Sequence, residues 1–181
     1  MDPITELNRA LENLVRAGTI AALDTKAARC RVATGGLVTG WLPFFQPRAG
    51  EDQVWDPPSL KEQCVVIAPG GRTACGFVLV GLFSQHFPAP SDSPTRHLRQ
   101  YRDGAVVLYD AETHTLNATL PAGGTVHIEA PGGLSVLGNV TIEGSLTASE
   151  DVKAGAAGIS LVNHLHGGVK SGPDTSGKPL P

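Results

Sequence analysis

The most regular pattern in the chain is an unbroken alternation of apolar and polar positions from residue 116 to residue 148. Even-numbered positions are apolar or glycine and odd-numbered ones are mostly polar, with Leu137 the clear exception. A period of two is the side-chain repeat of an extended strand. The phase survives Pro121, Pro131 and two glycine pairs, where an ordinary sheet would change phase at its turns. The pattern predicts one long ribbon with one face buried throughout.

A single extended ribbon has nothing against which to bury that face. The simplest partner is another copy of the same chain. Glycines at the inward positions 124, 132, 138 and 144 leave room for backbones to approach closely. We therefore expect three ribbons to wind into an intertwined β-helix. A monomeric β-solenoid is the alternative. It would need coils of regular length, and the sequence of this stretch does not repeat at any fixed coil length.

The N-terminal part predicts a short helix and then a small barrel. Asp2 and Pro3 are a good helix start, apolar residues follow at helical spacing, and Gly18 is expected to end the run. Five strand-like runs follow at residues 19–23, 29–34, 37–42, 63–68 and 76–83. Five short strands favour an OB-fold.

The expected fold class is thus all-β: an N-terminal OB-fold barrel followed by an intertwined trimeric triple-stranded β-helix with a metal-bound apex. A Pro- and Ser-rich stretch from Pro88 to Pro94 is the expected boundary between them. The predicted parts are an N-terminal amphipathic helix (1–17), an OB-fold domain (18–87), a linker (88–98), a β-helix spike (99–155) and an apex (156–181).

The bulk composition agrees with a turn-rich β protein whose buried space is narrow. The 181 residues include 22 Gly and 14 Pro, and only 5% are aromatic. The net charge of -3 gives no electrostatic reason to expect nucleic acid. Neither a membrane span nor a Sec signal peptide is expected from the sequence. Cys30, Cys64 and Cys75 lie in apolar runs without metal spacing, so we expect buried free thiols in a reducing cytoplasm.

His164 and His166 are the candidate metal ligands. Two residues apart in an extended strand, their imidazoles would share one face. One chain would offer only two nitrogens, whereas three symmetric copies would offer six on one axis. Six neutral nitrogens fit an octahedral ion, which argues against tetrahedral zinc and for iron, nickel or a similar metal. The remaining histidines are expected on the surface: His86, His97, His114 and His127.

Signatures of an enzyme are weak. The glycine pairs at 70–71 and 123–124 lack the lysine and the following helix of a phosphate loop, and no residue sits in a nucleophile elbow. A metalloenzyme with an open histidine site would need a further ligand, for which Asp174 is the local candidate. Arg96, Arg99 and Arg102 lack interleaved aromatics and are expected to make surface or inter-subunit contacts. We expect no enzymatic activity.

Four segments resemble the baseplate assembly protein V family, the central spikes of P2-type contractile phage tails and R-type pyocins. They are residues 40–43 (GWLP), 63–71 (QCVVIAPGG), 76–84 (GFVLVGLFS) and the apex motif 158–167 (GISLVNHLHG). The resemblance covers nearly the whole chain in the same order, and the apex motif is its most specific part.

The resemblance implies a homotrimeric spike in which His164 and His166 of three chains hold one iron ion (Fe2+) through six imidazoles. Further ions inside the spike are compatible with it. It also implies a mechanical role: sheath contraction drives the tube and its spike into the outer membrane of a Gram-negative cell. The spike would cap the tail tube. It would contact the tail hub and baseplate proteins through the N-terminal helix and the barrel surface, and no nucleic acid.

The expected location is the baseplate tip of a virion or tailocin particle, assembled in the cytoplasm of the bacterial host. The alternative function is a trimeric receptor- or glycan-binding tail fibre module. Such a module needs exposed aromatics for sugar stacking, and the chain has only two Trp and two Tyr.

Overall fold

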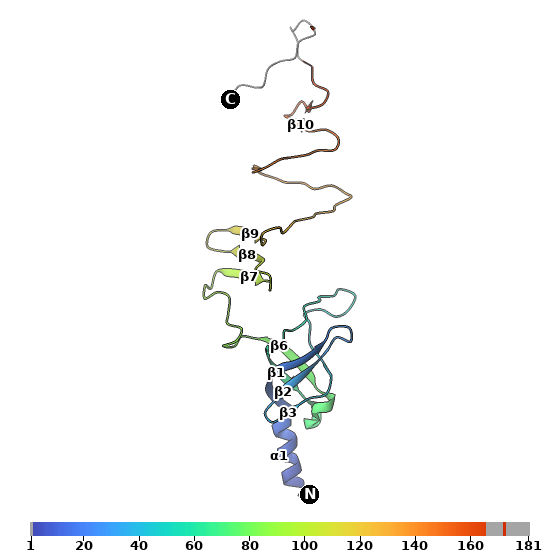
Figure 1. Cartoon of the computed structure of the whole chain (residues 1–181), viewed down its shortest axis with the longest axis vertical. Coiled ribbons are helices and arrows are strands. Elements are labelled where there is room, and N and C mark those ends of the chain that lie inside the picture. Colours follow the sequence, from blue (N-terminus) through green and yellow to red (C-terminus); the bar gives the residue numbers. More distant parts are fainter. Residues whose placement is uncertain (1, 166–171, 173–181) are drawn as a thin grey trace. The chain divides into compact units, whose positions relative to one another are not determined.

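The computed structural model describes residues 2–165 and residue 172. They belong to two compact units, Met1–Val126 and His127–Pro181, shown in Figure 1. No helix in the described residues is long and apolar enough to cross a bilayer.

Helix α1 (Pro3–Leu14) begins where the sequence predicts, with the Asp2 carboxylate accepting a hydrogen bond from the Ile4 N–H at 3.4 Å. It ends earlier than expected, because Val15 is extended and pairs with Ile67. Gly18 therefore lies inside a strand and does not terminate the helix. A Cβ at Gly18 would come within 2.5 Å of Val32 Cγ1, so the barrel needs glycine there for close packing.

Six strands form the first sheet: β1 (Val15–Asp24), β2 (Arg29–Thr34), β3 (Leu37–Val38), β4 (Leu42–Pro43), β5 (Gln63–Ile67) and β6 (Phe77–Leu82). Their order is β3-β2-β1-β5-β6, and β4 also pairs with β2. A bridge between Phe44 and Val78 joins the end of β4 to β6 and closes the barrel. Two 3-10 turns, η1 (Pro69–Gly71) and η2 (Thr73–Cys75), connect β5 to β6. The predicted runs all fall on these strands, with residues 37–42 divided between β3 and β4.

The barrel core consists of aliphatic side chains and two cysteines: Ile20, Cys30, Val32, Leu42, Cys64, Val66 and Val78. Burial raises the pKa of the Cys30 thiol to about 11 and that of Cys64 to about 12, so both stay protonated and pack as small hydrophobes. The prediction of three buried thiols is wrong for Cys75, which is exposed. The apolar run there is broken by η2, which carries Cys75 to the surface.

A second antiparallel sheet joins β7 (Arg96–Gln100), β8 (Val106–Asp110) and β9 (Thr115–Thr119). Strand β7 starts within the segment expected to be linker (88–98). An ion pair between Arg96 in β7 and Asp110 in β8 helps to hold the start of this strand in place. Tyr109 lies opposite Leu116, and Val107 opposite Ala118. Odd positions of β8 and even positions of β9 therefore share one face, and the apolar phase of the ribbon starts in this sheet.

From residue 120 to residue 152, a stretch described in full, the chain is extended but forms no strand within itself. Turns close where the sequence has its glycine pairs: the Gly124 N–H donates to the Pro121 carbonyl and the Gly133 N–H to the Ala130 carbonyl, each at 2.8 Å. The alternating apolar side chains are largely exposed in the single chain, with Val126 at 72% and Leu134 at 70%.

Candidate functional site: the apex hairpin

A small hairpin precedes the first candidate metal ligand. Strand β10 (Lys153–Ala154) pairs with β11 (Ile159–Ser160). The connecting turn is closed by a 3.0 Å hydrogen bond from the Gly158 N–H to the Gly155 carbonyl. Both glycines have positive φ, 70° and 62°, a conformation that other residues adopt only with strain. Residues 154–158 therefore form a defined turn.

The Asp151 carboxylate ties the chain after β11 to the chain before β10. It accepts a hydrogen bond from the Val162 N–H at 3.2 Å, while the Leu161 N–H donates to the Val152 carbonyl at 2.8 Å. A hydrogen bond from the Ser160 side chain, supported by backbone N–H groups, lowers the pKa of Asp151. The sequence did not reveal this residue, because its partners lie nine to eleven positions away and meet it only once the hairpin forms.

His164 follows a turn at residues 161–163 and does not lie in a strand. Its Nδ1 is 3.0 Å from the Ser160 carbonyl oxygen and 3.2 Å from that of Leu161. A carbonyl oxygen only accepts, so these contacts are hydrogen bonds when Nδ1 carries a proton, and in the neutral ring the lone pair is then on Nε2. This is the tautomer that a metal-ligating histidine adopts when its other nitrogen is held by a backbone carbonyl.

His166 and Asp174 lie outside the described residues, so the shared face of His164 and His166 stays a prediction. No group of three or more potential metal ligands occurs in the described part of this single chain. The four remaining histidines are exposed in the single chain, as predicted: His86, His97, His114 and His127.

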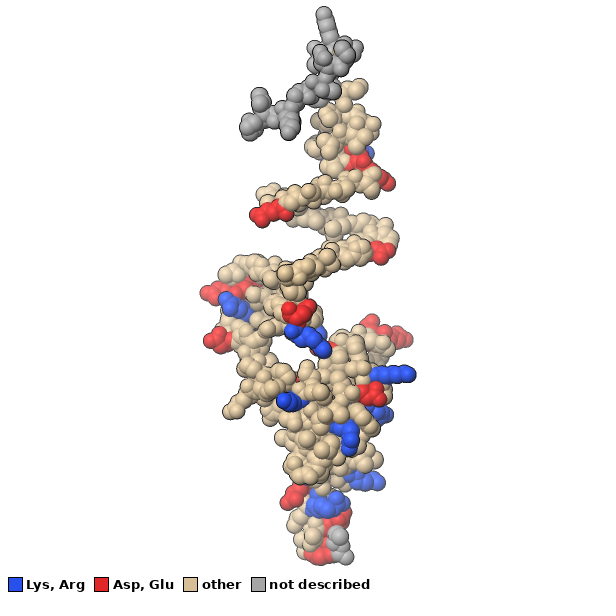
Figure 2. All heavy atoms as spheres, viewed as in Figure 1, with Lys and Arg blue, Asp and Glu red and all other residues tan. Residues whose placement is uncertain are grey.

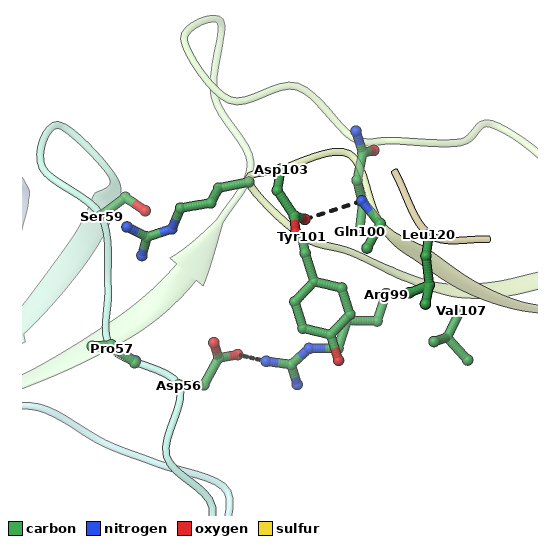
Figure 3. A pocket seen from close by; sticks show the side chains of 11 residues that line it. Asp56, Pro57, Ser59, Arg99, Gln100, Tyr101, Asp103, Val107 and Leu120 are labelled. Atoms are coloured by element: carbon green, nitrogen blue, oxygen red, sulfur yellow. Dashed lines mark hydrogen bonds and ion pairs between the residues drawn. The ribbon is translucent and has the colours of Figure 1, made fainter. Parts of the chain in front are cut away.

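A surface hollow of about 860 Å³ lies between the loop at Asp56 and strand β7 and is shown in Figure 3. The Arg99 guanidinium pairs with the Asp56 carboxylate at 2.8 Å and lies over the Tyr101 ring at 5.1 Å from its centroid. The charges of Arg99 and Asp56 are thus paired with each other, as is typical of a structural contact. The expectation that no aromatic residue lies among the arginines is wrong, because Tyr101 follows Arg99 by two residues and contacts it. Arg99, predicted to make surface or inter-subunit contacts, joins the barrel to the second sheet of its own chain.

Comparison with known proteins gives two family matches. Residues 16–83 match the type VI secretion system/phage-baseplate injector OB domain. Residues 158–179, which include His164, match the GpV apex motif, a motif known for metal binding. The first match confirms the OB-fold expected for the barrel, and the second begins at Gly158, in the turn of the apex hairpin.

The chain is also 41% identical to the spike protein of Escherichia phage P2 over 134 residues, which is 71% of this chain. The match covers 64% of that relative's length. Together these matches confirm an all-β chain with an OB domain and a spike apex, and they agree with a structural, non-enzymatic protein. The chain belongs to the baseplate assembly protein V family of phage baseplate spikes.

Proposed function

We propose that three copies of this chain wind their ribbons into a rigid β-helical spike that caps the tail tube and pierces the outer membrane when the sheath contracts. The observation that carries the proposal is the ribbon at residues 116–148. Its apolar side chains alternate regularly, yet they are exposed in the single chain, with Leu116 at 71%.

The backbone of the ribbon supports the same conclusion. An extended segment presents N–H and C=O groups that need partners once water is excluded. Within residues 120–152 the single chain supplies turn bonds but no strand pairing. Two further copies would supply the missing ladders, and closure of three ribbons on one another would leave no exposed strand edge.

Charge along the ribbon agrees with this arrangement. Residues 116–152 contain no Lys or Arg, and their acidic side chains, visible in red in Figure 2, are few. Glu129 and Glu143 fall on odd positions, the polar face of the pattern, whereas Glu150 and Asp151 lie beyond its end at residue 148. A trimer that buries the even positions up to residue 148 would therefore keep Glu129 and Glu143 in water, where they cost little.

We propose that His164 and His166 of the three chains bind one iron(II) ion at the tip through six imidazole nitrogens. The tautomer of His164, with its proton on Nδ1, suits this role. The apex hairpin and the hydrogen bonds of Asp151 would hold His164 in a fixed position at the tip. The ion would supply structural cross-linking of three chain ends, because six filled positions leave no site for a substrate.

The OB domain would face the tail hub. Its outer surface carries a cluster of exposed apolar side chains, in which the rings of Phe45 and Phe77 lie 6.2 Å apart and Leu79 is also exposed. Such a cluster is typical of a protein contact surface. The assembled spike would then lie at the baseplate tip of a virion or tailocin.

A double variant, His164→Ala with His166→Ala, tests the tip and the piercing role. We expect the purified variant to remain a trimer but to lose its stoichiometric iron, because no imidazole remains at the apex. Elemental analysis measures the metal, and a variant that still binds one iron per trimer would refute these ligands.

The same variant is then assembled into particles. We expect normal sheath contraction by electron microscopy but slower potassium efflux from target cells, because the three chain ends are no longer pinned. Particles with the Ser135→Ala variant, altered on the polar face of the ribbon, serve as the control. Efflux as fast as in wild type would contradict a mechanical role for the metal-bound tip.

A further inference from the structure

The apolar residues of helix α1 follow the spacing of a coiled coil. Ile4, Leu7, Leu11 and Leu14 are separated by three, four and three residues, the a-d-a-d pattern of a heptad repeat. These four side chains form the α1 seam. The first three are 55–67% exposed and Leu14 is 37% exposed, so the protein's own barrel leaves the seam largely uncovered.

The flank of the helix, and not its seam, is attached to the barrel. A Cβ at Gly71 would lie 2.5 Å from the Ala10 Cα, so the backbone of α1 packs directly on η1. Ala10 is a g position beside the seam. This close contact holds α1 in a fixed orientation on its own domain while the α1 seam stays open.

The charged groups of the helix lie away from the seam. Glu6 and Arg9 form an ion pair with each other on the outer face, and Glu12 is at a b position. The residues beside the seam, Asn8 at e and Ala10 at g, are uncharged. Identical helices could therefore meet along the seam without placing like charges opposite one another.

We propose that the α1 helices of three copies pack through this seam into a short, parallel, in-register three-helix coil. The inference rests on the proposed trimer. Rotation about a three-fold axis places identical elements at the same height, and helices that lie along the axis are parallel, which is what matching a and d layers require. A 12-residue helix is marginal alone, but the spike would tether three copies together and raise their effective concentration.

Cross-linking of the full-length protein tests the proposal. The exposed native thiol is first removed by Cys75→Ser; the buried Cys30 and Cys64 do not react. Leu7→Cys in this background places a thiol in the seam, and Arg9→Cys places one on the outer face as the matched control. We expect a short bis-maleimide to join Leu7→Cys chains into covalent dimers at least tenfold more efficiently than Arg9→Cys chains.

Native mass spectrometry of the same samples separates the possible failures. A trimer whose Leu7→Cys chains cross-link no better than the Arg9→Cys control refutes the three-helix coil and leaves the spike intact. In that case the seam is open to another protein, such as the hub. A protein that is not a trimer refutes the proposed spike and the coil together.

Discussion

Replacing Leu134 by Ala tests whether the ribbon is buried between chains. Full burial of a leucine contributes about 1.5–3 kcal/mol. Leu134 is 70% exposed in the single chain, so trimer formation covers about seven tenths of it, and its loss removes about 1–2 kcal/mol per chain. Three copies lose about 3–6 kcal/mol, which lowers the trimer association constant by roughly 10²–10⁴.

The assay is a urea titration in which analytical ultracentrifugation measures dissociation of the trimer at several protein concentrations. The matched control is Ser135→Ala, the next residue, on the opposite face of the ribbon. We expect the control to change stability by no more than about 0.5 kcal/mol, as is usual for surface positions. Equal, small effects of Leu134→Ala and Ser135→Ala would refute the buried ribbon, because an exposed leucine can be truncated at little cost.

Two further predictions concern the hairpin and the barrel. Because hydrogen bonds lower the folded pKa of Asp151, its stabilising effect is present above the ordinary carboxyl pKa of about 4 and is lost as pH falls through the lowered value. The protection of the Val162 amide against hydrogen exchange, taken relative to the unprotected rate at the same pH, should therefore fall in acid, and in Asp151→Asn already at neutral pH. Unchanged protection would contradict the carboxylate's role. Gly18→Ala should destabilise the barrel by about 1–3 kcal/mol, because the added methyl group would overpack against Val32. The control Gly36→Ala should not, because the space around Gly36 is open. Equal melting temperatures for the two variants would count against this packing.

The barrel could be predicted from sequence because its strands carry local patterns. Short apolar runs bounded by turns marked β2 and β5 nearly to the residue. The end of α1 could not be placed, since Val15 continues the helical spacing, and only its pairing with Ile67 in the folded barrel makes it a strand residue. Cys75 was misplaced for a similar reason, because neighbouring apolar residues concealed the turn η2.

The apex motif could be recognised from the sequence because its residues are consecutive, and residues 158–179 match the GpV apex motif. The His-x-His spacing is local as well, so it marks His164 and His166 as candidate ligands, and their role stays a prediction. Asp151 was missed, because a carboxylate that bonds a backbone N–H eleven residues later leaves no periodic signal. The ribbon is the opposite case, because its alternation is plain in the sequence. Its apolar side chains stay exposed in a single copy, since the chain offers no surface of its own to cover them.

Native mass spectrometry of the untagged full-length protein, purified without metal affinity, tests the central claim most directly. The intertwined spike predicts a particle of three chains with one iron ion. A trimer without metal would retain the spike and remove the role of the ion. A stable monomer would contradict the account, because the exposed ribbon and its unpaired backbone would then have no partner.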